Sequence, residues 1–144
     1  MSKKILFLGY SKNQTRIIDY LKQIKNIRLS HTNKKIKPKD VNKFDTIISF
    51  GYRHILELET LSKHKNFINL HSSYLPFNRG AHPNFWAFAE NTPCGVTIHK
   101  LDDGIDKGDI IFQKLMDFES NEINIISYMD EKYPYLYKKL KKPP

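Results

Sequence analysis

Short apolar runs alternate along the chain with segments whose apolar residues recur every three or four positions. The runs at residues 4–10, 45–51 and 67–71 are rich in β-branched and aromatic residues, which predicts buried strands. A further strand is predicted at residues 27–31. The helix predicted after the first run has one apolar face, made of Ile17, Ile18, Leu21 and Ile24.

The second half of the chain continues this alternation. Helices are predicted at residues 53–63 and 82–91, the second with Pro83 as its first helical residue. Strands at 95–101 and 109–118 are joined by the turn 102–108. A last helix, at 121–142, is expected to break at Pro134. Apolar strands alternating with helices predict an α/β fold with a doubly wound, mostly parallel sheet, and no repeat or long linker divides residues 1–144 into more than one domain.

The composition argues against a membrane-spanning, secreted or disulfide-rich protein. No apolar run approaches the roughly 20 residues that a membrane helix needs. The apolar run at residues 5–8 is too short for a secretion signal. A single Cys rules out an internal disulfide framework and suits a reducing compartment. We therefore expect a cytoplasmic protein that is not associated with a membrane.

The positive charge is concentrated at one end of the sequence. Residues 1–50 hold 12 Lys and Arg against 3 Asp and Glu, which accounts for the whole net charge of +9. The basic run at 32–40 is either a solvated lysine-rich loop, the simpler interpretation, or a segment that attracts a phosphorylated substrate or polyanion. Basic residues do not interleave with aromatic residues in a nucleic-acid-binding pattern, so a nucleic-acid partner is not indicated.

Polar residues occupy the end of the strand at 67–71, where apolar residues would be ordinary. Asn69 and His71 are two positions apart, so both side chains point to the same side, at the carboxyl end where α/β sheets bind ligands. Asp106 lies in a turn bounded by glycines. Each of the three residues alone has a structural explanation, but together they supply an oxyanion stabiliser, an acid–base group and an orienting carboxylate. His71, His82 and His99 lack the compact spacing of a metal site.

Three ordered motifs carry a resemblance to a known family: N-L-H-S-S-Y-L-P-F-N-R-G at 69–80, G-V-T-I-H at 95–99 and D-D-G-I-D-K-G-D-I-I at 102–111. They resemble the catalytic core of the formyl-tetrahydrofolate-dependent formyltransferases, a family that includes glycinamide ribonucleotide, methionyl-tRNA and sugar N-formyltransferases. The resemblance extends from about Ser49 to Gln113. It implies a Rossmann-like fold in abbreviated form, formyl-tetrahydrofolate as co-substrate, and catalytic roles for Asn69, His71 and Asp106.

The resemblance also implies a mechanism. A substrate amine attacks the formyl carbon, and Asn69 and a protonated His71 stabilise the negative charge that develops on the formyl oxygen. Asp106 keeps His71 charged, since a neighbouring carboxylate favours the imidazolium, and helps to move the proton of the amine.

Binding residues are assigned by the same resemblance. The folate is expected to lie against residues 49–56, at the end of the strand predicted at 45–51, and against the backbone of the 102–106 turn. Without the resemblance, residues 49–56 would be interpreted as an ordinary helix N-terminus. The folate candidates are Tyr52, Arg53, His54, Ile55, Leu56, Asp103 and Gly104, and the acceptor-substrate candidates are Ser73, Arg79, Gly80 and His82.

The formyl acceptor is suggested by residues 79–99. The motif R-G-A-H-P-N-F-W-A-F and the segment after it look most like the sugar N-formyltransferases, which implies a small nucleotide-linked amino sugar as substrate. The amino half is shorter than the family pattern, with 35 residues between Gly9 and Asp45. Two alternatives therefore stay open: a non-catalytic folate- or nucleotide-sugar-binding module or partial subunit, and an enzyme similar to methionyl-tRNA formyltransferase. A stripe of Tyr128, Tyr135, Leu136, Tyr137 and Leu140 is either a homodimer face or, more simply, a face turned to the core.

Overall fold

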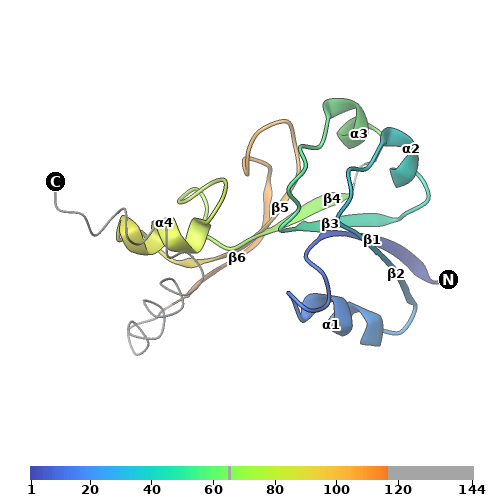
Figure 1. Cartoon of the computed structure of the whole chain (residues 1–144), viewed down its shortest axis with the longest axis horizontal. Coiled ribbons are helices and arrows are strands. Elements are labelled where there is room, and N and C mark those ends of the chain that lie inside the picture. Colours follow the sequence, from blue (N-terminus) through green and yellow to red (C-terminus); the bar gives the residue numbers. More distant parts are fainter. Residues whose placement is uncertain (65, 117–144) are drawn as a thin grey trace.

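A computed structural model of the chain describes residues 1–64 and 66–116. In this part of the chain six strands form one sheet in the order β2-β1-β3-β4-β5-β6 (Figure 1). The strands are β1 (Lys3–Gly9), β2 (Ile27–Thr32), β3 (Thr46–Phe50), β4 (Phe67–His71), β5 (Gly95–Lys100) and β6 (Ile110–Leu115). The helices are α1 (Ile17–Gln23), α2 (Pro38–Val41), α3 (Leu58–Ser62) and α4 (Pro83–Ala89).

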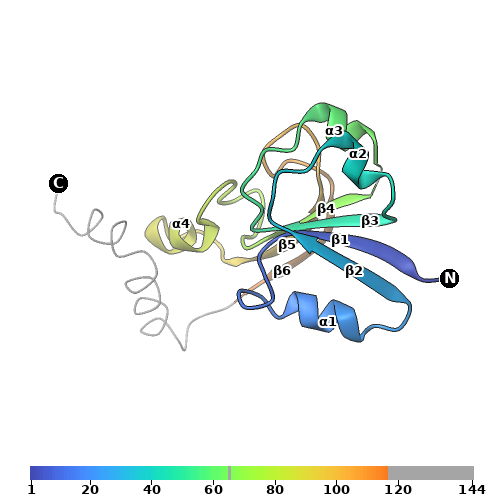
Figure 2. The ribbon, with the colours of Figure 1, turned by 45° about the vertical axis from the view of Figure 1, so that its right-hand side comes forward.

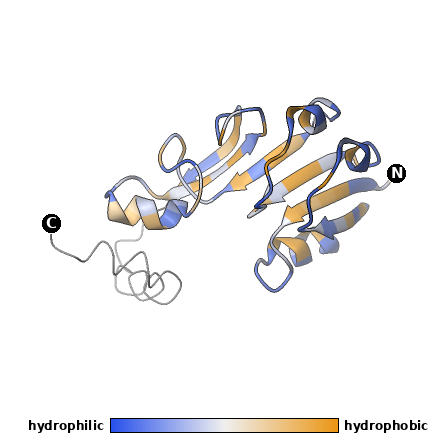
Figure 3. Ribbon diagram, turned by 45° about the horizontal axis from the view of Figure 1, so that its top comes forward, coloured by the Kyte–Doolittle hydropathy of each residue, from blue (hydrophilic) through white to orange (hydrophobic). Residues whose placement is uncertain are grey.

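Strands β2, β1, β3 and β4 are parallel, and helices cover both faces of this half of the sheet. Figure 2 shows α1 on one face and α2 and α3 on the other. Successive residues of β1 alternate between the two faces: Leu6 and Leu8 belong to the core cluster on the α2 and α3 side, whereas Ile5 and Phe7 belong to the cluster that includes Ile18 of α1. Figure 3 shows the hydrophobic residues concentrated in the strands. The prediction of a doubly wound, mostly parallel α/β fold is confirmed.

The sheet changes direction after β4. Strand β5 runs antiparallel to β4, and β6 runs antiparallel to β5. In the register of β4 and β5, Asn69 is paired with His99 and His71 with Thr97. The polar end of β4 therefore has a parallel neighbour on one side and an antiparallel neighbour on the other.

The structure differs from the prediction in two segments, the basic run at 32–40 and the helix predicted at 53–63. The basic segment contains the short helix α2, because Ile36 and Val41 are buried in the core and the Asp40 carboxylate accepts the backbone N–H of Lys37 at 2.8 Å. The prediction of a helix from residue 53 was wrong, since α3 begins only at Leu58.

The other predicted helices have different outcomes. The prediction for α4, with Pro83 at its first position, is confirmed. The predicted helix at 121–142 and its tyrosine stripe lie outside the described residues. None of the helices in residues 1–64 and 66–116 is long and apolar enough to cross a membrane.

Candidate active site

The three polar residues that the sequence singled out meet at the carboxyl end of β4. Asn69 and His71 project from the same face of the strand, and the turn between β5 and β6 brings Asp106 against both of them. The Asp106 Oδ2 atom lies 3.6 Å from His71 Nδ1, and Asn69 Nδ2 donates to Asp106 Oδ1 at 3.3 Å. His71 is 8% exposed, so this carboxylate and imidazole face each other at a largely desolvated position.

The position of Asp106 is fixed by the loop that follows β4. The backbone N–H of Gly80 donates to Asp106 Oδ2 at 2.7 Å, and Arg79 Nε donates to the backbone carbonyl of Asp106 at 3.2 Å. Asp106 itself has a φ of 49°, a left-handed conformation that Asp tolerates better than most residues. The two loops therefore hold the carboxylate between the imidazole and the amide.

The protonation of His71 is constrained by its second ring nitrogen. His71 Nε2 lies 2.8 Å from the backbone carbonyl of Asn78, which only accepts, so Nε2 carries a hydrogen and donates. The remaining nitrogen, Nδ1, faces Asp106. This nitrogen can accept a proton, and once protonated it can donate to Asp106 or to a developing oxyanion.

His99 is a fourth member of the site, although the sequence assigned it no catalytic or binding role. Its side chain is fully buried, and its Nε2 lies 3.4 Å from Asp106 Oδ1 and 3.2 Å from Asn69 Nδ2. Its Nδ1 lies 2.8 Å from the carbonyl of Lys100 and donates to it. The signal for His99 was present in the alternation of β5, which turns residues 95, 97 and 99 to one face, but its meaning depended on the pairing with Asn69.

The electrostatics of the site favour an ionised carboxylate at Asp106 and a charged imidazole at His99. Burial opposes the ionised form of Asp106, but hydrogen bonds from His99 and Gly80 and the charges of His71 and His99 outweigh it, so the pKa of Asp106 is lowered from 3.8. Burial also opposes the charged form of His99, but the hydrogen bonds to Asp106 and Lys100 and the negative charges of Asp106 and Asp102 raise its pKa above 6.5.

The folate candidates form an irregular loop after β3 that is tied to the basic segment. The Tyr52 hydroxyl donates to the carbonyl of Lys34 at 2.9 Å and accepts the N–H of Ile36 at 3.1 Å, and burial raises its pKa. His54 Nε2 donates to the carbonyl of Asn33 at 3.1 Å. Leu56 packs on the core, whereas Arg53, His54 and Ile55 are exposed. Of these three, Arg53 and Ile55 have no hydrogen bond or ion pair to another described residue, and His54 is held by Asn33.

The opposite wall of the predicted folate site is the turn between β5 and β6. Asp103 is exposed there, and the N–H of Gly104 donates to Asp102 Oδ1 at 2.8 Å. Among the described residues no group of three or more His, Cys, Asp or Glu is arranged to hold a metal ion.

The acceptor candidates divide into two groups. Ser73 is 1% exposed, its hydroxyl donates to the carbonyl of Phe77 at 2.7 Å, and it therefore holds its own loop together rather than facing solvent. Arg79 and Gly80 contact Asp106, and His82 is exposed at the start of α4. A cavity of about 310 Å³ adjoins this group and is lined by Asn78, Arg79, Trp86 and Glu90.

Comparisons with a family model and with solved structures indicate the same family. The model of the family described as "Formyl transferase" matches residues 22–124. The structure of the formyltransferase PseJ from Anoxybacillus kamchatkensis, in complex with UDP-4,6-dideoxy-4-formamido-L-AltNAc and tetrahydrofolate, is similar with a TM-score of 0.73 and 34% sequence identity, over 96% of this chain and 78% of that one.

Curated relatives match a shorter part of the sequence. A methionyl-tRNA formyltransferase of Anaeromyxobacter dehalogenans is 41% identical over 81 residues, which are 54% of this chain and 26% of that protein. A dTDP-4-amino-4,6-dideoxyglucose formyltransferase of Mycobacterium bovis is 31% identical over 80 residues, 56% of this chain and 34% of that protein. The chain thus spans about a quarter to a third of the length of these relatives.

Proposed function

The chain belongs to the formyl transferase family, and from that premise we propose that it transfers a formyl group from formyl-tetrahydrofolate to the amine of a nucleotide-linked amino sugar. The observation that carries the proposal is the Asp106 carboxylate, which lies within 3.6 Å of His71 Nδ1 and within 3.3 Å of Asn69 Nδ2. The similarity to PseJ, whose complex contains tetrahydrofolate and a UDP-linked formamido sugar, supports this choice of substrates.

The chemistry needs donors for an oxyanion and a route for one proton. The free amine attacks the formyl carbon, a new C–N bond forms, and the formyl oxygen becomes negatively charged. Asn69 Nδ2 and a protonated His71 Nδ1 are the donors for that oxygen. When the bond to the folate nitrogen breaks and the carbonyl re-forms, the product amide has lost one proton and the folate nitrogen has gained one.

Asp106 is suited to both steps. Its carboxylate faces His71 Nδ1 and stays ionised because its pKa is lowered, so it is available to accept the proton of the attacking amine. Gly80 and Arg79 restrain its position, which reduces the reorganisation needed during the reaction.

Substrate positions follow from the exposed groups around the site. The loop with Arg53 and Ile55 offers a cation and an apolar surface for the folate. The cavity lined by Asn78, Arg79, Trp86 and Glu90 offers a guanidinium for a diphosphate and an indole for a ring, and its Arg79 also contacts the backbone of Asp106.

The test is an assay of tetrahydrofolate release with formyl-tetrahydrofolate and a panel of nucleotide-linked amino sugars. We expect turnover with at least one sugar, reduced by about 10²–10³ in kcat in Asn69→Ala, since loss of a single oxyanion donor has that effect. His71→Ala should also lose turnover while keeping its fold and its affinity for folate.

Two other functions are separated by the same assay. The similarity to a methionyl-tRNA formyltransferase makes methionyl-tRNA the necessary second acceptor, and turnover with it alone would contradict the sugar assignment. Folate or nucleotide-sugar binding without turnover on any acceptor would instead identify a binding module or a partial subunit.

A further inference from the structure

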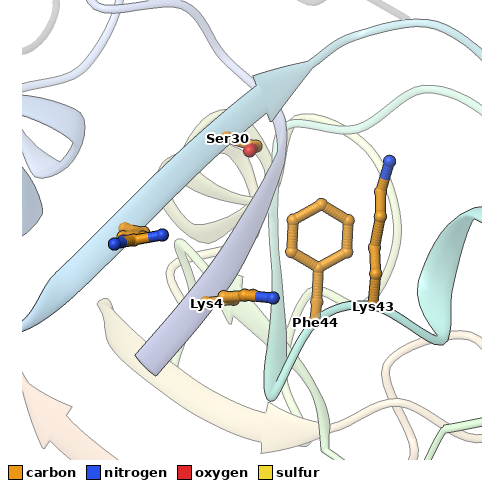
Figure 4. A pocket seen from close by; sticks show the side chains of 5 residues that line it. Lys4, Ser30, Lys43 and Phe44 are labelled. Atoms are coloured by element: carbon orange, nitrogen blue, oxygen red, sulfur yellow. The ribbon is translucent and has the colours of Figure 1, made fainter. Parts of the chain in front are cut away.

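A second depression lies away from the active site and plays no part in the chemistry above. It has a volume of about 260 Å³ and is lined by Lys4, Arg28, Ser30, Lys43 and Phe44 (Figure 4). Lys4 and Arg28 are the second residues of β1 and β2, and Phe44 precedes β3. The depression is therefore at the amino ends of parallel strands, whereas Asn69 and His71 are at the carboxyl end of β4.

The sheet register aligns the cations of this depression. Lys4 of β1 is paired directly with Arg28 of β2, so the two side chains share a face, and Ser30 follows two positions after Arg28 on that same face. Lys43 comes from the turn before β3, and its Nζ lies 5.5 Å from the centre of the Phe44 ring. Figure 4 shows Lys4 and Lys43 on either side of that ring.

The charges of the depression are not balanced by the described residues. Like charges directly opposite each other on neighbouring strands are destabilising, and Lys4 with Arg28 is such a pair. Within residues 1–64 and 66–116, none of the three cations forms an ion pair with a carboxylate. The neighbouring carboxylate, Asp45, is exposed and uses Oδ2 to accept the backbone N–H of Lys4 at 2.7 Å. A bound anion would relieve this repulsion.

We propose that this depression binds the phosphate or diphosphate group of a small anion, at a site distinct from the formyl-transfer site. A guanidinium provides a planar fork for phosphate oxygens, two ammonium groups add point charges, and the Ser30 hydroxyl is a further donor. The volume is below the roughly 300–1,000 Å³ of pockets for drug-sized ligands, so the site accommodates the phosphate part and leaves the rest of a larger ligand in solvent.

The experiment is a titration of the full chain with pyrophosphate at constant ionic strength, followed by melting temperature and by backbone amide shifts. We expect a saturable rise in melting temperature, with shifts at Ser30 and Phe44. Arg28→Gln should abolish both effects, and the matched variant Lys22→Gln, which removes an exposed charge on α1, should keep them. An equal rise in Arg28→Gln, or shifts confined to the surroundings of Arg79, would overturn the proposal.

Two further comparisons complete the test. Because Arg28→Gln removes one member of a repelling pair, its melting temperature without ligand should equal or exceed that of the parent chain, so loss of the response cannot reflect unfolding. UDP is titrated in parallel. Binding of UDP at Ser30 and Phe44 as tight as that of pyrophosphate identifies a nucleotide as the source of the diphosphate, and binding of pyrophosphate alone identifies the free anion. The outcome is independent of the formyl-transfer assay.

Discussion

The Asp106 carboxylate is shared by two imidazoles and an amide, and its contact with His99 helps to raise the pKa of that imidazole against the effect of burial. It lies 3.4 Å from His99 Nε2 and 3.6 Å from His71 Nδ1. Burial opposes the charged form of His99, and Asp106 is the largest influence that offsets it, with the Lys100 carbonyl and Asp102 adding to it. A neutral residue at position 106 would leave burial as the dominant influence on His99.

This coupling gives a prediction for Asp106→Asn. In the parent chain the raised pKa of His99 contributes stability that is fully present below 6.5 and is lost as the pH rises through that pKa. The contribution can reach at most about 1.4 kcal/mol per pH unit for one proton. In Asp106→Asn we expect the pKa of His99 to fall and the loss of stability above pH 6.5 to become smaller or reverse. Urea unfolding between pH 6 and 9, with a ring NMR titration of His99, measures both.

The outcome for other variants makes this prediction specific. His71→Ala keeps the Asp106–His99 contact, so the ring NMR titration of His99 should keep its raised pKa in that variant. An unchanged His99 titration in Asp106→Asn would contradict the coupling.

At the residue scale the sequence was informative where local geometry was sufficient. The two-residue spacing of Asn69 and His71 placed them on one side of a strand, and the structure brings Asp106 to both. The role of His99 in the site was not predicted, because its contacts with Asn69 depend on the register between β4 and β5. The inward position of the Ser73 hydroxyl likewise depends on how its loop folds back to Phe77.

The turn between β5 and β6 is the element on which the position of Asp106 depends. A Cβ atom added at Gly108 would collide with the backbone carbonyl of Lys100, whereas one added at Gly104 would meet only the flexible side chain of Lys107. We expect Gly108→Ala to lower the unfolding free energy by about 1–3 kcal/mol, as overpacking against fixed atoms does. Gly104→Ala should have a smaller effect, and chemical denaturation compares the two. Equal losses would show that the turn adapts as a whole.

The loop after β3 is a second element that can be tested alone. Tyr52→Phe removes the hydroxyl that contacts Lys34 and Ile36, which leaves the partly buried N–H of Ile36 and the exposed carbonyl of Lys34 without that partner. We expect a loss of about 1 kcal/mol in stability and a higher KM for formyl-tetrahydrofolate with little change in kcat. Steady-state kinetics separate the two parameters.

The control for Tyr52→Phe is the ion pair of Lys35 and Glu57, which joins the same two segments at 2.8 Å. Both side chains are well exposed, so Lys35→Gln should leave the KM unchanged. A loss of kcat in Tyr52→Phe, with KM unaffected, would place the loop in the chemical step instead.

Element boundaries were less predictable than element types. Strands β1, β3 and β4 were clear from their apolar runs because both faces of the parallel half are buried. The start of α3 was predicted too early, because contacts with residues 33–36, distant in sequence, hold Tyr52 and His54 outside the helix. Helix α2 was missed because it is only four residues long and overlaps the end of the lysine-rich run 32–40. Of the two buried residues there, Ile36 precedes the helix and Val41 is its last residue.

At the scale of the whole molecule, positive charge is concentrated in the amino-terminal part of the chain. Residues 1–50 alone carry a net charge of +9. They form β1, β2 and β3 with their connections, so this charge lies on one half of the sheet, and Lys4 with Arg28 is a repelling pair within it. Self-repulsion of this kind destabilises the compact state and is weakened by salt.

The expected consequence is a chain that becomes more stable as sodium chloride increases from 0.1 to 1 M, where the Debye length falls from about 10 to about 3 Å. For each kcal/mol of repulsion that is screened, the melting temperature should rise by about 2–4 °C. The double variant Lys4→Gln with Arg28→Gln should show a smaller rise than Lys22→Gln with Lys25→Gln, since only the first removes charges that oppose each other in the sheet. Calorimetry at increasing sodium chloride concentration measures the melting temperatures. Equal rises in the two double variants would mean that the repulsion is spread over the whole basic half. A fall in melting temperature with salt would mean that attraction between opposite charges dominates.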